Sequence, residues 1–207
     1  MKKFFVFAAA AAFALVACTK DDTNKVDGSN NNDGKEVAGL VLNELDGQNK
    51  FIELYNTTDK EISLEGVNIV KYDSSKEGGK STTWVGAKDM KIAAKAWVVL
   101  ESSDLKDPAE KGDPNYVYES ENHIFKGGLS PKKNVKIELY DATGKLLDEF
   151  VRGTEGAGWN QVKGYAENED CSFSRVPDGT GKFVYAAPTK KAANGAKVAD
   201  IEQAPEM

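Results

Sequence analysis

The chain alternates between short runs of β-branched and aromatic residues and segments rich in Gly, Asn, Asp and Lys. Every second residue is apolar from Phe51 to Tyr55 and from Val135 to Tyr140, which is the pattern of half-buried β-strands. Residues 141–144 lie between two such runs and suit a hairpin turn with Gly in the left-handed conformation. The pattern predicts strands at residues 37–45, 50–56, 67–72, 82–85, 96–100, 135–140, 146–150, 173–176 and 183–186.

No segment beyond the N-terminal apolar run keeps helical periodicity over three turns. Many short strands joined by Gly-rich turns are typical of a β-sandwich or a β-barrel. The sequence therefore predicts an all-β domain over residues 36–195. The last residues, 196–207, are polar, and we expect this C-terminal tail to fray.

A long polar segment, residues 101–122, interrupts the strand pattern, and a loop of this length in a compact domain is either functional or merely tolerated. Asp104, Asp107, Glu110 and Asp113 recur at every third position, a spacing that would gather carboxylates on one turn of helix. They are a candidate site for a divalent cation such as Ca²⁺, which prefers oxygen ligands. The alternative is a solvated acidic loop, and no other cofactor is indicated.

The first residues have the features of a secretory signal peptide, residues 1–17. Lys2 and Lys3 precede an apolar run, residues 4–16, which is shorter than the roughly 20 residues that span a bilayer. The run ends in Leu15-Val-Ala-Cys18, which resembles the bacterial lipobox, in which Cys is lipidated and becomes the mature N-terminus. We expect acyl chains on Cys18 to anchor the protein to a membrane. The alternative is an ordinary signal peptide that is cleaved nearby.

Lys20-Asp21-Asp22 follows this cysteine and resembles the surface-export signal of Bacteroidetes lipoproteins. We therefore expect an outer-membrane lipoprotein exposed at the cell surface, with a periplasm-facing location as the alternative. Residues 18–35 are predicted to be a flexible tether, because residues 27–34 contain nothing apolar to bury. If Cys18 carries lipid, Cys171 is the only remaining thiol, so no intramolecular disulfide forms.

Charge and composition argue against several classes of function. Lys and Arg total 27 against 33 Asp and Glu, a formal net charge of -6, so we expect no nucleic-acid partner. His123 is the only histidine, which excludes a two-histidine metal motif, and no serine is marked as a catalytic partner for it. The chain is therefore expected not to be an enzyme. A carboxylate-dependent extracellular hydrolase, assisted by a divalent cation, is the alternative.

Several motifs follow one another in a defined order. They are residues 41–45, 51–59, 62–70 and 96–100, then 129–131 with 135–139, then the close from Ser172 to Gly179 (SFSRVPDG), followed by Phe183, Pro188-Thr189 and Asn194-Gly195. This order resembles the lamin-tail domain family, whose ending is S-x-x-R-x-P-D-G. The resemblance covers about residues 37–195 and implies an immunoglobulin-like β-sandwich.

The motif residues suggest structural roles. Glu53 lies inside an apolar strand and is expected either to pair with Arg175 or to point into water. Asn56 and Asp59 suit the turn that follows their strand. A turn leaving a strand is expected at Pro177, Asp178 and Gly179.

Two segments depart from the family's pattern, and we expect any function peculiar to this protein to lie there. Residues 101–122 are longer than expected, and residues 152–170 add a Gly-rich loop. Loop aromatics stack on sugars or anchor a protein partner, unless they attach their loops to the core. We expect a membrane-anchored binding module for a glycan, a surface protein or an envelope component, or an accessory to a separate enzyme. The candidate binding residues are Trp159, Tyr165, Tyr116 and Tyr118.

Overall fold

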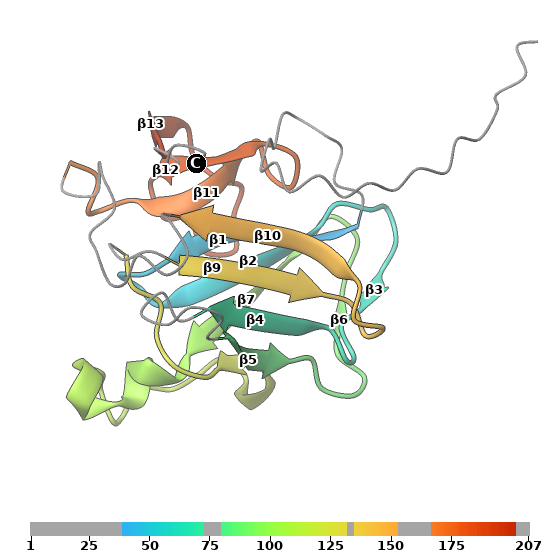
Figure 1. The fold of residues 1–207 in the computed structure, drawn as a ribbon, viewed down its shortest axis with the longest axis horizontal. Helices are drawn as coiled ribbons and strands as arrows, with labels where there is room; N and C mark the ends of the chain where they lie inside the picture. The colour runs from blue at the N-terminus through green and yellow to red at the C-terminus, as the bar shows by residue number, and fades with distance from the viewer. Residues whose placement is uncertain (1–38, 73–79, 132–134, 153–166, 202–207) are drawn as a thin grey trace, which may run out of the picture. The chain divides into compact units, whose positions relative to one another are not determined.

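The computed structural model describes residues 39–72, 80–131, 135–152 and 167–201 (Figure 1). These residues form short strands and three 3₁₀ helices, and no α-helix occurs among them. The strands are β1 (Leu40–Asp46), β2 (Phe51–Asn56), β3 (Ile62–Ser63), β4 (Asn68–Tyr72), β5 (Lys80–Val85), β6 (Lys91–Ile92), β7 (Trp97–Ser102), β8 (Ile124–Phe125), β9 (Val135–Tyr140), β10 (Leu146–Arg152), β11 (Ser172–Val176), β12 (Lys182–Ala186) and β13 (Lys197–Asp200). The 3₁₀ helices are η1 (Ser103–Lys106), η2 (Pro108–Glu110) and η3 (Glu121–His123).

The strands form a β-sandwich, so the expectation of an all-β fold is confirmed. One sheet has seven strands in the order β13-β12-β11-β1-β2-β7-β8, and the other has four in the order β10-β9-β4-β5. The four-stranded sheet lies in front of β1, β2 and β7 in Figure 1. Pairing is antiparallel except between β7 and β8, and β3 and β6 form a small separate pair.

The hydrophobic core lies between the two sheets, as the alternating pattern predicts. Leu42, Ile52 and Leu54 of the larger sheet are buried in one cluster with Ile69 and Ile137 of the smaller sheet. Burying each such side chain contributes roughly 1.5–3 kcal/mol, so this layer dominates the stability of the sandwich. The opposite face of the larger sheet is also withdrawn from water, and it carries the polar residues described below.

A buried ion pair joins the two sheets beside β1. Arg175 of β11 donates through Nη2 to both carboxylate oxygens of Asp148 of β10, at 2.7 and 2.9 Å. Leu42 donates its backbone N–H to Asp148 Oδ2, and Arg175 Nε donates to the Leu42 carbonyl oxygen. The β1–β2 register shifts between Leu42 and Glu44. Leu42 lies opposite Leu54 of β2, but the pairing of β1 with β11 includes only Glu44 and Leu45, so the ion pair supplies the hydrogen-bond partners that β11 does not.

All nine strands that the pattern predicts are present, and the strands it missed have physical reasons. β3, β6 and β8 are two residues long, too short for any period to be visible. β13 lies within residues 196–207, where a fraying tail is expected. Its side chains are exposed or half-buried, and it is held through backbone pairing with β12. The larger sheet therefore continues to Asp200, beyond the expected domain boundary.

Candidate functional site

The chain between β7 and β8, residues 103–123, leaves the sandwich as a series of short 3₁₀ helices, and we call it the excursion. Ser102 accepts a hydrogen bond from the backbone N–H of Asp104 at the start of η1. Asp107 does the same for Ala109 at the start of η2, where Pro108 is the first residue. Such caps satisfy the free N–H groups at the starts of helices, so these polar residues stabilise the local structure of the excursion.

The four carboxylates with a spacing of three lie in this excursion, but the structure does not bring them together. Asp107 and Asp113 accept from backbone N–H groups, and the Asp104 carboxylate lies so close to Gly128 that a Cβ there would come within 2.1 Å. Lys111 adopts a left-handed conformation with φ of 65°, which turns the chain after η2. The spacing would gather the carboxylates only on a continuous helix. Among the described residues, no group of three or more His, Cys, Asp and Glu side chains is placed to hold a metal ion.

The two tyrosines of the excursion attach it to the end of β7. The Tyr116 hydroxyl donates to Glu101 Oε1 at 2.8 Å, and the Tyr118 hydroxyl donates to the carbonyl oxygens of Ser102 and Ser103. Their rings lie edge to face, with centroids 5.4 Å apart. Burial and the neighbouring Glu101 raise the pKa of Tyr116 to about 12. These contacts match the alternative in which the rings hold their loop. Trp159 and Tyr165 lie outside the described residues.

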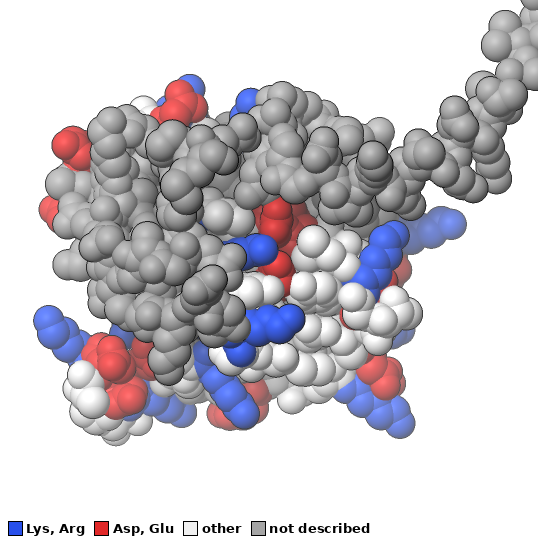
Figure 2. All heavy atoms as spheres, in the orientation of Figure 1, with Lys and Arg blue, Asp and Glu red and all other residues white. Residues whose placement is uncertain are grey.

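The surface of the excursion carries one large exposed apolar side chain, Val117, and several exposed acidic ones. The side chain of Val117 is 83% exposed. Five acidic residues of the excursion are also exposed, and Figure 2 shows Asp and Glu side chains gathered over the 3₁₀ helices at the lower left of the view. They are Asp107, Glu110, Asp113, Glu119 and Glu121.

Glu101 of β7 connects the excursion to the C-terminal part of the chain. The residue is 1% exposed, and its carboxylate accepts hydrogen bonds from the Tyr116 hydroxyl, the Glu119 N–H and the ammonium group of Lys190, which is 2.7 Å away. Burial raises the pKa of the Glu101 carboxyl, but the hydrogen bonds from Lys190 and Tyr116 outweigh it, so the pKa is lowered. Glu101 is therefore an ionised acceptor at neutral pH.

Residues 187–195, which we call the strap, cross the outer face of the larger sheet and bind two further buried glutamates. Thr189 donates its N–H and its hydroxyl to Glu44. Lys191 donates its N–H to Glu53 Oε2 at 2.7 Å, and Asn43 Nδ2 donates to Glu53 Oε1 at 3.1 Å. Glu44 and Glu53 lie opposite each other on β1 and β2. Two carboxylates are thus buried side by side under the strap.

The pKa of Glu53 reflects this burial. Desolvation raises the pKa to about 7, against the hydrogen bonds from Asn43 and Lys191, and the charges of Glu44 and Asp178 add to the rise. Burial likewise raises the pKa of Glu44. The expectation that Glu53 pairs with Arg175 or points into water is wrong, because the two side chains leave their strands on opposite faces of the sheet. Arg175 points between the sheets to Asp148, and Glu53 points under the strap.

The turn at Pro177, Asp178 and Gly179 anchors the end of the strap. Asp178 accepts from Asn43 Nδ2 at 2.7 Å and from the Asn194 N–H, and Asn43 in turn accepts from the Gly179 N–H. Gly179 has a φ of +68°, and a Cβ there would lie 2.7 Å from the ring of Tyr55. Glycine is therefore required at this position both by conformation and by space.

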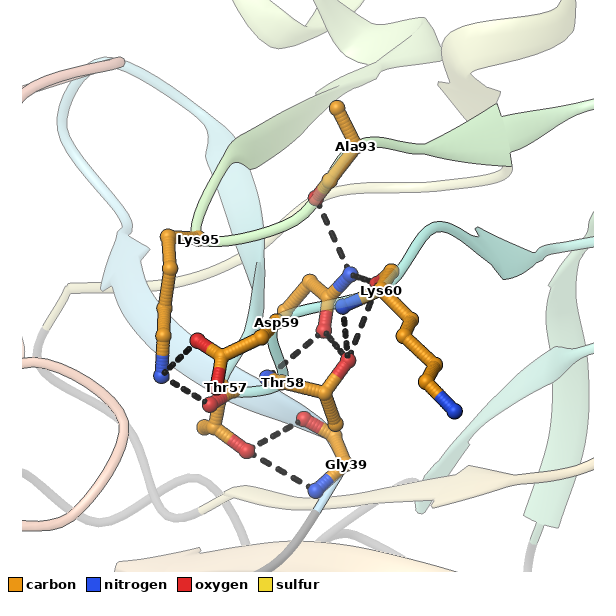
Figure 3. A network of polar contacts seen from close by, with 8 residues as sticks. Gly39, Thr57, Thr58, Asp59, Lys60, Ala93 and Lys95 are labelled. Carbon is orange, nitrogen blue, oxygen red and sulfur yellow. Dashed lines mark hydrogen bonds and ion pairs between the residues drawn. The ribbon is translucent and has the colours of Figure 1, made fainter.

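Asn56 holds a second polar turn at the end of β2 (Figure 3). Its side-chain amide donates to the carbonyl oxygens of Lys60 and Ala93, and its Oδ1 accepts from the Thr58 N–H. Lys95 Nζ lies 3.4 Å from the Asp59 carboxylate in the same network. Asn56 thus joins β2 to the turn before β7.

An open depression of about 760 Å³ lies at one end of the domain. Leu40, Ile62, Val67 and Leu147 contribute apolar surface to it, and Asp141 and Glu65 contribute acidic groups. None of the described candidate binding or metal-ligating residues from the sequence lines this depression. Separately, no helix among the described residues is long and apolar enough to cross a membrane.

The comparison with protein families agrees with this architecture. The sequence model of the Lamin Tail Domain family matches residues 24–154, more than half of the chain. The chain belongs to the lamin tail domain family. The opening motifs of this lamin tail domain lie inside the match, whereas the closing motif from Ser172 to Gly179 and the strap lie beyond it. A search of curated proteins finds no match.

Sequence reasoning missed the two most heavily bonded parts of this site, the strap and Glu101. One signal was present, since the polar pair Asn43-Glu44 interrupts an otherwise apolar strand. Its partners could not be read from the sequence, because Thr189 lies 145 residues from Glu44 along the chain.

Proposed function

We propose that this lamin tail domain is a membrane-anchored, non-catalytic module that binds a partner at the surface of a Bacteroidetes-type cell. The observation that carries the proposal is the construction of the excursion, which Tyr116 and Tyr118 fix to β7 while Val117 remains exposed at its surface. A rigidly held loop with an exposed apolar residue suits recognition, because little conformational entropy is lost on binding.

The N-terminal sequence supports the anchored location. A basic start and an apolar run lead to the lipobox-like Leu15-Val-Ala-Cys18, and Lys20-Asp21-Asp22 then matches the pattern of surface export. Lipid on Cys18 would hold the protein at the outer membrane. The polar tether, residues 18–35, would keep the β-sandwich away from the bilayer.

The chemistry of the excursion favours a protein partner over a neutral glycan. Its exposed acidic residues outnumber its basic residues, Lys106 and Lys111. A loop with several exposed carboxylates and one large exposed apolar residue complements a partner surface that carries cationic and apolar groups. The partner class that fits is therefore a basic surface of another envelope protein, and this interaction allows the domain to serve as an accessory to an enzyme.

The test is a cross-linking pull-down from intact cells that express the tagged full-length chain, with mass spectrometry as the readout. Val117→Ser is compared with Val85→Ser, since Val85 is also exposed, at 54%, and lies on β5. Glu110→Lys is compared with Glu65→Lys, a charge reversal at an exposed site outside the excursion. Recovery of one partner should fall about tenfold for each excursion variant and stay unchanged for its control.

Equal recovery with all four variants would show that the partner binds elsewhere. If no protein rises above background, a glycan array with the same variants tests the glycan alternative. Cys18→Ser tests the anchor separately, since the variant should leave the membrane fraction. Surface display is tested by protease treatment of intact cells, which should degrade the wild-type protein and spare a variant with Lys20, Asp21 and Asp22 replaced by alanine.

A further inference from the structure

The strap and β13 are attached to the domain in an unusual way. From residue 187 to residue 200, no side chain is buried. The strap is held mainly by hydrogen bonds to carboxylates of the sheet beneath it, and β13 is held by its pairing with β12 and by the half-buried Ala199, which packs against the core. Segments with few buried apolar contacts open locally at a lower free energy than the core does. The polar contacts therefore decide whether the strap stays closed.

Three backbone N–H groups of the strap each donate to a different carboxylate. Thr189 donates to Glu44, Lys191 donates to Glu53, and Asn194 donates to Asp178. The ion pairs found among the described residues include neither Glu44 nor Glu53. The strap thus closes over two adjacent carboxyl groups whose hydrogen-bond partners are dipoles and not cations.

The groups that face Glu53 come from each element around it. β1 contributes Glu44 and the amide of Asn43, the turn after β11 contributes Asp178, and the strap contributes the Lys191 N–H. The Lys191 ammonium group points away from Glu53 and pairs with Glu119 of the excursion. Glu101 of β7 lies on the same sheet face and is neutralised by Lys190. The charges nearest to Glu53 are therefore negative, and ionisation of its carboxyl increases their repulsion.

We propose that residues 187–200 form a latch that is closed while Glu53 holds a proton and opens as Glu53 ionises. Opening would separate Lys190 from Glu101 and Lys191 from Glu119, so the excursion would lose both of its contacts with the strap. It would also uncover the edge of β12, which β13 covers in the closed state. The latch rests on the contacts of the strap and does not depend on what the excursion binds.

The direction of the effect follows from linkage. In the closed state the pKa of Glu53 is about 7, whereas a Glu exposed to water by opening returns towards its ordinary value of 4.5. The closed state therefore binds the proton more tightly, and raising the pH favours the open state. Between about pH 6 and about pH 8, the open population should rise about tenfold.

Hydrogen exchange of backbone amides in the full chain, measured by NMR without any ligand, tests this proposal. Protection factors, corrected for the intrinsic exchange rate at each pH, should fall about tenfold for Thr189 and Lys191 between about pH 6 and about pH 8. The Leu139 amide in the central strand β9 reports on unfolding of the core and should change less. Protection of the Glu119 amide, which donates to Glu101, should follow the strap.

Glu53→Gln is the decisive variant, because it removes the ionisation and keeps the shape of the side chain. Strap protection in this variant should no longer depend on pH, whatever its absolute level. Glu119→Gln is the matched control, since it removes the exposed ion pair with Lys191 and should leave the pH dependence intact. If Glu53→Gln does not fold, Glu44→Gln is used instead. It removes the carboxyl group that lies across from Glu53 on β1, and it should reduce the fall in protection between about pH 6 and about pH 8.

Two results would overturn the latch. One is strap protection that is independent of pH in the wild-type protein. The other is a pH dependence that Leu139 shares in full, because the domain would then be unfolding as a whole. Neither result concerns the binding of a partner to the excursion, so failure of the latch and failure of the proposed function can be told apart.

Discussion

Glu53 and Glu101 lie on neighbouring strands of one sheet face, and both are withdrawn from water, yet their pKa values shift in opposite directions. Glu101 accepts from a lysine ammonium group and a phenol, and its pKa is lowered. Glu53 accepts only from an amide side chain and a backbone N–H, with two other carboxylates nearby, and its pKa is raised. A buried carboxylate stabilises the fold at neutral pH only where a cation or several strong donors offset its desolvation.

Asp148 is a third buried carboxylate, and its cation is Arg175. Removing Arg175 should have the largest effect on the free energy of unfolding. Arg175→Met leaves Asp148 buried without a cation and the Leu42 carbonyl oxygen without a donor. We expect a loss of about 3–5 kcal/mol in the free energy of unfolding, measured with urea. The double variant Asp148→Leu with Arg175→Met should recover part of the loss. A loss below about 1 kcal/mol for the single variant would contradict the buried pair.

The pH profile of stability separates the two glutamates. Because the folded pKa of Glu53 is raised to about 7, the stability that its protonation contributes is present below about pH 4.5 and is lost as the pH rises through about 7, a change of about 3 kcal/mol. Glu101 behaves oppositely, because its pKa is lowered. Its ionised carboxylate stabilises the fold at pH values above the ordinary Glu pKa, and this contribution is lost as the pH falls into the acid range. Thermal unfolding from acidic to slightly alkaline pH should show Glu53→Gln flattening the neutral part of the profile, and Glu101→Gln the acidic part.

Removing the cation from Glu101 should make it resemble Glu53. Lys190→Met should cost about 1 kcal/mol in the free energy of unfolding at neutral pH and raise the pKa of Glu101. Lys191→Met is the matched control, because its ion pair with Glu119 is exposed and should contribute less than about 0.5 kcal/mol. Equal losses for the two variants would show that burial of the pair is unimportant.

The smallest effect on the free energy of unfolding is expected when the Tyr116 hydroxyl is removed. Tyr116→Phe removes one hydrogen bond to Glu101 and keeps the ring pair with Tyr118. We expect a loss of about 0.5–1 kcal/mol and faster amide exchange in the excursion. If exchange in the excursion stays the same, the ring contacts alone hold it.

The sandwich was predictable from the sequence because its strands bury one apolar face, so a period of two is visible in β2 and β9. The turn residues Asn56 and Gly179 were also recognisable, since their roles depend on local backbone chemistry. The site was less predictable. Its carboxylates look like ordinary surface residues, and only contacts over more than one hundred positions show that Glu44, Glu53 and Asp148 are buried.

The spacing of acidic residues in the excursion was misleading for a related reason. A repeat of three suggests one face of a helix only if the helix continues, and here the chain passes from η1 to η2 through an extended residue, Asp107, and then turns at Lys111. The two loop tyrosines were placed correctly in a loop, but their hydroxyl partners come from the end of β7 and its continuation into η1. Whether a loop aromatic holds its own loop or is free to bind a partner therefore depends on long-range contacts that its local sequence does not show.

One measurement tests the central comparison most directly, namely an NMR titration of the side-chain carboxyl carbons of Glu53 and Glu101 in the full chain. Glu53 should titrate near pH 7, and Glu101 should titrate below the ordinary value of 4.5. If both carboxyl groups titrate together near 4.5, burial under the strap does not disfavour ionisation of Glu53, and the contrast between the two glutamates does not exist.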